Sequence, residues 1–251
     1  MRALGASFRT GASAWVSVAR AALQRCHLEY SVTVQGPGST PAQTVVRLAE
    51  PSDRDTIYRL RHQVFASELG QHAIRDTGVL HDHVDDHNVY IVAEHGGELL
   101  GFVSVTPPAA PSYALERHFR RSAVPIDLRG SFELRLLVIA ESARNHGLSE
   151  VLLFAALRWS EEHGATRIVG TGYGWVKRFY ESLGMEAVGP TAQSGALTLE
   201  LLSATVCQIM ESCRSRIDKV RQRIASGIVD WRLSIPVESA RHRLPIEHAH
   251  V

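Results

Sequence analysis

The sequence predicts an α/β domain with a mixed β-sheet, followed by a C-terminal helix. Strand-like and helix-like segments alternate from about residue 44 to residue 203 in the order β-α-β-β-β-α-β-α-β-β. Apolar residues make up 45% of the 251 positions and charged residues 21%, the balance of a globular protein that can bury a core. The longest apolar run, Val151–Leu157, is far shorter than the roughly 20 residues that span a bilayer.

Charge and cysteine content exclude several classes of function. The 27 basic and 26 acidic side chains leave a net charge of +1, which argues against broad attraction to nucleic acid or to an anionic membrane. Three cysteines, Cys26, Cys207 and Cys213, are too scattered for a disulfide framework or a zinc site and favour a reducing compartment. We therefore expect a cytoplasmic protein with no metal, no nucleic-acid partner and no membrane partner.

The ends of the chain differ in composition from its middle. Residues 1–28 contain arginines but no acidic residue, which is typical of an organellar transit peptide; a mobile extension or an upstream start codon explains the same composition. Residues 35–41 have the composition of a linker. The chain therefore divides into a mobile or targeting extension and linker at 1–43, a compact domain at 44–203, and a C-terminal helix and tail at 204–251. A transit peptide would place the protein in an organelle.

The domain begins with a strand at Val45–Leu48 and a helix. We expect Ser52 to be the N-cap of this helix, with Asp55 three residues later. Gly70 ends the helix, and its apolar face consists of Leu60, Val64 and Leu69. The next segments are a loop or irregular helix at 71–87, a hairpin of strands at 89–94 and 99–106 joined by residues 95–97, and a short amphipathic segment at 112–121.

The second half of the domain continues the alternation of strands and helices. It contains a strand at 132–139, a helix at about 148–163 closed by Gly164, a strand at 167–171, a helix at 175–183, and two short strands that end near Leu202.

A single long helix is expected after the domain. Apolar residues recur there in steps of four and three until Gly227: Val206, Met210, Cys213, Ile217, Val220 and Ile224. This seam fits a helix that packs on the surface of its own domain. It also fits a homodimeric coiled coil through residues 204–226.

The segment between the strand at 132–139 and the next helix predicts an anion site. Backbone amides at the start of a helix carry no intrahelical bond, and Gly147 would let a phosphate approach them. Arg144 can add a charge-assisted hydrogen bond. A tight strand-to-helix turn explains the same residues.

In this context the sequence resembles the GCN5-related N-acetyltransferase (GNAT) superfamily. Arg144-Asn145-His146-Gly147-Leu148-Ser149 is similar to the acyl-CoA loop pattern [QR]-x-x-G-x-[GA] of that superfamily, and the segment Phe179–Met185 is similar to its F-Y-x-x-L-G-[FM] motif. The resemblance covers about residues 45–202 and implies a mixed central sheet flanked by helices. It implies acyl-CoA, most simply acetyl-CoA, as cosubstrate. The loop and residues Leu137, Val138 and Ile139 of the preceding strand would then bind the donor.

A narrower resemblance lies upstream. Residues 60–65 are similar to L-R-x-x-V-F, and residues 82–90 to D-x-x-D-x-x-x-x-Y, as in the branch shared by acyl-homoserine-lactone synthases and N-acyl amino acid synthases. The resemblance implies that Asp82 and Asp85 bind the acceptor. Arg61 on the first helix is a candidate to bind an acceptor carboxylate, or else it is a surface charge. Two positions depart from these patterns: Ser149 ends the loop motif in place of Gly or Ala, and Ser104-Val105 stands where many members of the branch carry an arginine. The second departure favours acyl-CoA over an acyl-carrier protein as donor.

Two residues are candidates for proton transfer. Glu133 alternates with Phe132 and Leu134 in a strand, so it faces opposite to them; it is a candidate base, or else an ion-pair partner of Arg135. Tyr180 matches the general acid of the superfamily by position and can protonate a departing thiolate, or else it is a core tyrosine. The acyl carbonyl oxygen would meet a backbone amide near Leu137 or Val138.

The histidine- and aspartate-rich segment 81–87 has no recognised zinc or calcium spacing, so an acceptor-binding loop or a solvated loop is expected there. Together these features predict an acyl-CoA-dependent N-acyltransferase. Its simplest activity is acetyl transfer to the amine of a small molecule or amino acid, by direct attack on the thioester. The alternatives are a long-chain N-acyl amino acid or autoinducer-type synthase, and a non-catalytic acyl-CoA-binding regulatory module.

Overall fold

An eight-stranded sheet forms the middle of the protein, as seen in a computed structural model that describes residues 43–194 and 197–233. The strand order is β6-β7-β5-β4-β3-β2-β1-β8, and only the β4–β5 and β1–β8 pairs are parallel. The strands are β1 Thr44–Leu48, β2 Val89–His95, β3 Glu98–Thr106, β4 Ser131–Ile139, β5 Arg167–Gly172, β6 Glu186–Ser194, β7 Leu197–Thr205 and β8 Val229–Trp231. The mixed sheet expected from the sequence is confirmed.

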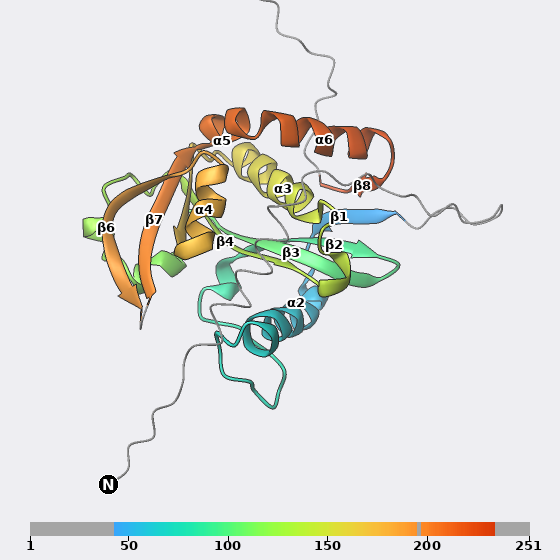
Figure 1. Cartoon of the computed structure of the whole chain (residues 1–251), viewed down its shortest axis with the longest axis horizontal. Helices are drawn as coiled ribbons and strands as arrows, with labels where there is room; N and C mark the ends of the chain where they lie inside the picture. The colour runs from blue at the N-terminus through green and yellow to red at the C-terminus, as the bar shows by residue number, and fades with distance from the viewer. Residues whose placement is uncertain (1–42, 195–196, 234–251) are drawn as a thin grey trace, which may run out of the picture.

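Helices cover both faces of this sheet. Helix α2 lies on one face, and α3, α5 and α6 lie on the other (Figure 1). The helices are α2 Arg54–His62, which continues as a π-helical turn at Gln63–Glu68, α3 Leu148–Glu162, α4 Gly174–Ser182, α5 Val206–Ser212 and α6 Arg214–Ala225. The order of elements as far as β7 agrees with the sequence analysis, although β6 and β7 are longer than the short strands expected there.

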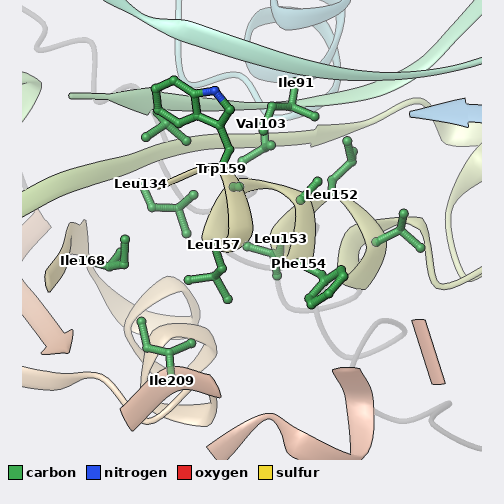
Figure 2. Close-up of a cluster of buried hydrophobic side chains, with 14 of the residues drawn as sticks. Ile91, Val103, Leu134, Leu152, Leu153, Phe154, Leu157, Trp159, Ile168 and Ile209 are labelled. Atoms are coloured by element: carbon green, nitrogen blue, oxygen red, sulfur yellow. The ribbon is translucent and has the colours of Figure 1, made fainter. Parts of the chain in front are cut away.

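Each face of the sheet buries its own apolar cluster. Side chains of α3 pack against β2, β3, β4 and β5, as Figure 2 shows for Leu152, Leu134 and Ile168. On the opposite face, Ile57 and Leu60 of α2 pack on the strands. Because both faces are covered, the central strands are apolar on both sides, which explains their continuous apolar runs in the sequence.

The start of the first helix differs from the prediction. Ser52 is not its N-cap; it lies inside a 3-10 turn, Pro51–Asp53, that precedes α2. The Asp53 carboxylate accepts a hydrogen bond from the Glu50 amide at 2.7 Å, so the capping interaction falls two residues earlier than expected. Asp55 instead forms an ion pair with Arg59 across one helical turn.

The β2–β3 hairpin is confirmed. Gly96 and Gly97 have φ values of 60° and 84°. Only glycine adopts two such successive conformations without strain, and this geometry matches the twist of the two strands.

The region after the domain contains two helices and a strand in place of one helix. The helical path breaks at Cys213 between α5 and α6, and β8 then pairs in parallel with β1. The predicted seam packs within the chain, because Ile217 and Val220 of α6 are buried in the same cluster as α3. Packing in cis is therefore confirmed. A homodimer through residues 204–226 stays a prediction and would have to use another face of these helices.

The C-terminal helices thus share a core with the sheet. The division at residues 203 and 204 stays a prediction, but the described part of the segment, up to Leu233, packs on the cluster that α3 organises. Among the helices described, none is long and apolar enough to cross a membrane.

Replacing Ile217 by Lys should destabilise the fold strongly. Ile217 is 5% exposed, so the ammonium group would be buried between α6 and α3 without a partner. Thermal unfolding should show a fall of many degrees. Gln222→Lys is the matched control, because Gln222 is exposed on the same helix and should tolerate the change. If Ile217→Lys only halved the mass in light scattering and left the melting temperature intact, packing in cis would be wrong.

Candidate active site where β4 and β5 separate

The pairing of β4 with β5 ends early. The two strands pair only from Ser131 opposite Arg167 to Glu133 opposite Val169, although both strands continue beyond these residues. From Leu134 onward, β4 has a neighbouring strand only on the β3 side. Backbone groups that point away from β3 are therefore available to other partners. The predicted donor-binding residues Leu137, Val138 and Ile139 lie in this one-sided part of β4.

A β-bulge shifts the side chains of β4 at the same place. Leu136 lies opposite Ser104 and Leu134 lies opposite Val105, so Arg135 is the extra residue. Phe132 and Leu134 face α3, whereas Leu136 packs with α2 on the other face. The bulge thus leaves Glu133 and Arg135 on the α2 face of the sheet.

Tyr180 of α4 reaches this region from the α3 face. Its hydroxyl donates a hydrogen bond to the Leu134 carbonyl at 3.0 Å, where β4 has just left β5. Its ring lies against Gly170 of β5, where a Cβ would be 2.9 Å from the ring carbon Cζ. Burial raises the pKa of Tyr180, and the nearby Glu133 adds to the effect. The side chain is thus a neutral proton donor at physiological pH.

Glu133 lies one residue before Leu134 and is almost fully buried. Its two carboxylate oxygens accept hydrogen bonds from the backbone amides of Ala114 and Leu115, at 2.7 Å and 2.8 Å. Burial raises the pKa of Glu133 to about 7, while the Ala114 hydrogen bond and the charge of Arg135 partly oppose that rise. A carboxyl group with such a pKa can exchange a proton near neutrality.

The expected ion pair between Glu133 and Arg135 is not formed. Arg135 instead pairs with both Asp82 and Asp85, the two aspartates predicted to bind an acceptor. Arg61 of α2 binds the same two carboxylates, at 2.9 Å to Asp82 and 2.8 Å to Asp85. Both side chains lie on the α2 face, as the sequence rule predicts. The pair is not formed because the Ala114 and Leu115 amides bind Glu133, and the aspartates of a distant loop bind Arg135.

These residues form a cluster, called here the buried ionic cluster, of Arg61, Asp82, Asp85, Arg117 and Arg135. Arg117 lies at its rim with a side chain that is 41% exposed, and the other four are buried or nearly so. Arg117 completes it with an Asp82 contact at 3.2 Å. Burial alone would raise the pKa of Asp82, but the charge of Arg135 and the hydrogen bond and charge of Arg61 outweigh it and lower that pKa to about 2. Asp82 is therefore ionised across the physiological range. The cluster contains three arginines and two aspartates, so positive groups are in excess by one.

Asp85 is the centre of the cluster. It is 1% exposed and also accepts hydrogen bonds from the Tyr90 hydroxyl at 2.8 Å and the Asp82 amide at 2.6 Å. A hollow of about 520 Å³ lies beside it. The hollow is lined by Tyr58, Arg75, His81, Asp82, His83, Asp85 and Asp86. The structure thus brings Arg61, Asp82 and Asp85 together, and the two aspartates line a space that can admit a small molecule.

The predicted acyl-CoA loop has the geometry of an anion site. Asn145 and Gly147 have φ values of 67° and 70°, and α3 begins at Leu148. The amides of Leu148, Ser149 and Glu150 occupy the first turn, where no intrahelical acceptor exists. The first helical bond runs from the Val151 amide to the Gly147 carbonyl.

Two side chains of this loop are engaged within the protein. Arg144 pairs with Glu68 at 2.5 Å and donates to the Ile139 carbonyl at 3.1 Å, so it holds the loop against the π-helical turn. The Ser149 hydroxyl bonds to Glu150. Arg144 thus forms an ion pair inside the chain, and the anion contact expected of it stays a prediction.

Sequence reasoning missed several members of the site. Arg117 and the role of Arg135 depend on how the loops before β2 and β4 fold over the sheet, which no local pattern reveals. Tyr90 was part of the D-x-x-D-x-x-x-x-Y pattern, so a signal for it existed. Within residues 43–194 and 197–233, no group of three or more His, Cys, Asp or Glu side chains is arranged to hold a metal ion.

Asp85→Asn should destabilise the protein, because it leaves two buried arginines without a full counter-charge. Loss of one partner from a buried ionic cluster costs about 3–5 kcal/mol. Asp86→Asn is the matched control, since Asp86 is the exposed neighbour in the same turn. Chemical denaturation should give a clearly lower free energy of unfolding for Asp85→Asn than for Asp86→Asn. Equal stability of both would show that the cluster contributes nothing to folding.

Comparisons with known proteins agree with this fold. The chain resembles the CoA-dependent acyl-homoserine lactone synthase BjaI, whose structure contains SAM and isopentyl-CoA, with a TM-score of 0.58 and 22% identity over 79% of this chain and 96% of that one. It also resembles FeeM, an N-acyl amino acid synthase from uncultured soil microbes, with a TM-score of 0.56 and 14% identity over 68% and 96% of the two chains. At these identities the likeness concerns the fold. No curated protein matches the chain.

The family follows from the sequence match. Residues 54–185, from the start of α2 to the end of the segment after α4, match the model of the acetyltransferase (GNAT) family. This range includes the separation of β4 and β5, the loop before α3, and Tyr180. The chain belongs to the acetyltransferase (GNAT) family.

Proposed function

We propose that this protein is an N-acyltransferase that moves an acyl group, most simply acetyl, from acyl-CoA to the amine of a small molecule or amino acid. The observation that carries the proposal is the placement of Glu133 and Tyr180. Glu133 is a residue of β4 whose side chain lies on the α2 face of the sheet. Tyr180 reaches the next residue, Leu134, from the α3 face, at the point where β4 leaves β5.

These two residues have the protonation states that the reaction needs. The acceptor nitrogen forms a bond to the acyl carbon as the carbon–sulfur bond breaks, and the nitrogen loses a proton while the sulfur gains one. Glu133, with a pKa of about 7, takes the proton from the amine directly or through water. Tyr180 gives its hydroxyl proton to the thiolate, since its raised pKa keeps that proton in place until the thiolate forms.

The donor and the acceptor have separate places around this point. The loop Arg144–Ser149 and the first turn of α3 receive the phosphates of the donor. A backbone amide of β4 near Leu137 or Val138 polarises the acyl carbonyl, because the strand has no neighbour on the β5 side there. The hollow beside Asp82 and Asp85 receives the acceptor. Because arginines already pair with these two carboxylates, the ammonium group of the acceptor suits the exposed Asp86, and its carboxylate, if present, suits Arg75.

A longer acyl chain is the alternative within the same reaction class. The solved structures that resemble this chain include an acyl-homoserine lactone synthase bound to isopentyl-CoA and an N-acyl amino acid synthase. A panel of acyl-CoAs from acetyl to long-chain, with free thiol as the readout and mixed amines as acceptors, distinguishes the two. Acyl-CoA binding without thiol release for any acceptor would favour a non-catalytic binding module.

Glu133→Gln should lower turnover by about 10²–10⁴-fold with little effect on acyl-CoA affinity. In the parent protein kcat should rise with pH through an apparent pKa near 7, because the base acts only when deprotonated. In the variant, kcat should no longer rise with an apparent pKa near 7. Part of the rate should return at high pH, where the amine is already neutral. Glu116→Gln, a nearby carboxylate that pairs with Arg121, is the control.

Tyr180→Phe should also reduce turnover but without recovery at high pH, since its hydroxyl acts on the leaving group. The phenyl ring keeps the packing against Gly170. The assignment would be wrong if Glu133→Gln and Tyr180→Phe both turned over substrate normally while melting at lower temperature. Glu133 would then only hold the Ala114 and Leu115 amides, and Tyr180 would be a core residue.

Gly147→Asp should abolish CoA binding, because the new carboxylate repels phosphate and occupies the loop. Gly164→Asp is a matched control at the other end of α3: Gly164 has φ +84° and nothing lies within 4 Å of its missing Cβ. Both changes place a non-glycine residue at positive φ, which costs about 1–2 kcal/mol of stability. At Gly147 the new Cβ would also lie 2.3 Å from Nη1 of Arg223, so that side chain must shift. Calorimetry should find CoA binding only in the Gly164 variant and the parent. If both variants bound CoA equally well, the loop would not be part of the donor site.

A further inference from the structure

The amides that hold Glu133 belong to a long connection without an α-helix or a strand of its own. Between the end of β3 at Thr106 and the start of β4 at Ser131, its regular structure consists of the 3-10 turns Ala114–Arg117 and Arg121–Ala123. Such a connection keeps one conformation only where its side chains or backbone groups fasten it to the rest of the fold. The position of the two amides therefore depends on what fastens the first turn.

Tyr113 fastens the first turn to the start of β4. It is buried and directly precedes Ala114, the first residue of the turn. Its hydroxyl donates to the Leu128 carbonyl at 2.9 Å and to the Ser131 carbonyl at 2.8 Å, so the two carbonyls share its one proton. Both carbonyls lie at the far end of the same connection. The phenol thus joins the turn to the strand that carries Glu133.

The carboxylate of Glu133 takes its orientation from this turn. The successive amides of Ala114 and Leu115 each donate to a different carboxylate oxygen. Amides at the start of a helical turn have no acceptor inside the turn, and a buried carboxylate needs donors. Because the two amides are neighbours in the chain, a movement of the turn would lengthen both hydrogen bonds together.

We propose that Tyr113 is a positioning residue for Glu133: its hydroxyl fastens the turn to β4, and the turn holds the carboxylate in place. The inference rests on the proposed function, in which Glu133 is the base. It adds a residue that acts through the two amides and not on the reacting atoms.

The charges around Glu133 stay the same when the Tyr113 hydroxyl is removed. Arg135 of β4, Glu116 of the turn and Tyr180 of α4 also face Glu133. Burial is the main cause of the raised pKa of Glu133, which the charge of Arg135 lowers and that of Glu116 raises. Burial raises the pKa of Tyr113 to about 12 and also raises that of Tyr180, so both phenols are neutral near pH 7. A further rise in the pKa of Glu133 would therefore report weaker amide hydrogen bonds, since these lower it.

The test is a pH titration of the full chain, followed by carbon-13 NMR of its glutamate carboxyl groups. The Glu133 signal is the one that Glu133→Gln removes. Tyr113→Phe should raise the midpoint of this signal by about one pH unit, because the turn moves away from the carboxylate. Ala114→Pro should raise it too, because it deletes one amide. The backbone suits proline there, since Ala114 begins the turn and Tyr113 is extended.

Turnover should show the same shift. In Tyr113→Phe, kcat at pH 7 should fall about five-fold, because the deprotonated fraction of Glu133 falls from about one half to about one tenth. The loss should disappear near about pH 9, and the KM for acyl-CoA should not change.

Ser131→Ala is the matched control. It removes a hydroxyl hydrogen bond to the Asp127 carbonyl within the same connection and leaves both contacts of the Tyr113 phenol. The Glu133 midpoint should then equal that of the parent.

Three results would contradict these claims. An unchanged Glu133 midpoint in Tyr113→Phe, together with a lower melting temperature, would show that Tyr113 only stabilises the fold. An equal rise in Ser131→Ala would assign the effect to the whole connection and not to Tyr113. If the midpoint rose as expected but Glu133→Gln transferred acyl groups as fast as the parent, Tyr113 would still position the carboxyl group. The proposed role of Glu133 as the base would then be wrong.

Discussion

The early end of the β4–β5 pairing is the constraint on which the candidate site depends. A central strand normally satisfies its backbone groups on both sides, but β4 has a neighbour on only one side after Glu133. Tyr180 satisfies the first of these groups through its bond to the Leu134 carbonyl. Arg144 satisfies another, the Ile139 carbonyl, and the groups between these two positions have no neighbouring strand on the β5 side. In the proposed function these groups belong to a rigid strand, so binding the substrate does not require a loop to be ordered first.

The buried ionic cluster stabilises the opposite side of the same strand. Asp82 and Asp85 come from the loop before β2, Arg61 from α2, Arg117 from the segment before β4, and Arg135 from the β4 bulge. Charges this deeply buried are tolerated only because each has an ionic partner. The cluster ties two long connecting segments to the sheet, and it thereby fixes the position of the hollow beside them. The Ala114 and Leu115 amides, which hold Glu133, belong to one of these segments.

Sequence patterns predicted most helices and strands correctly, but they did not predict contacts between residues that lie far apart in the chain. The mixed sheet, the loop before α3 and the location of Tyr180 on α4 followed from periodicity, glycine positions and the resemblance to a family. Arg61, Asp82 and Asp85 were also correctly grouped. The helix break at Cys213 was missed because the spacing of apolar residues records which side chains are buried and not whether the helix axis bends. The pairing of Arg135 and the position of Arg223 depend on how a distant loop folds and on the direction of α6, which are tertiary features.

The parallel pairing of β8 with β1 has a consequence for how the chain folds as it is made. Thr44 at the start of the domain pairs with Val229, so this contact closes a loop of nearly the whole described chain. During synthesis the outer edge of β1 stays open until the ribosome has released residues beyond Trp231. An open strand edge is a place where nascent chains associate wrongly. When β8 pairs with β1 it covers this open edge, and association of nascent chains through the edge is then prevented.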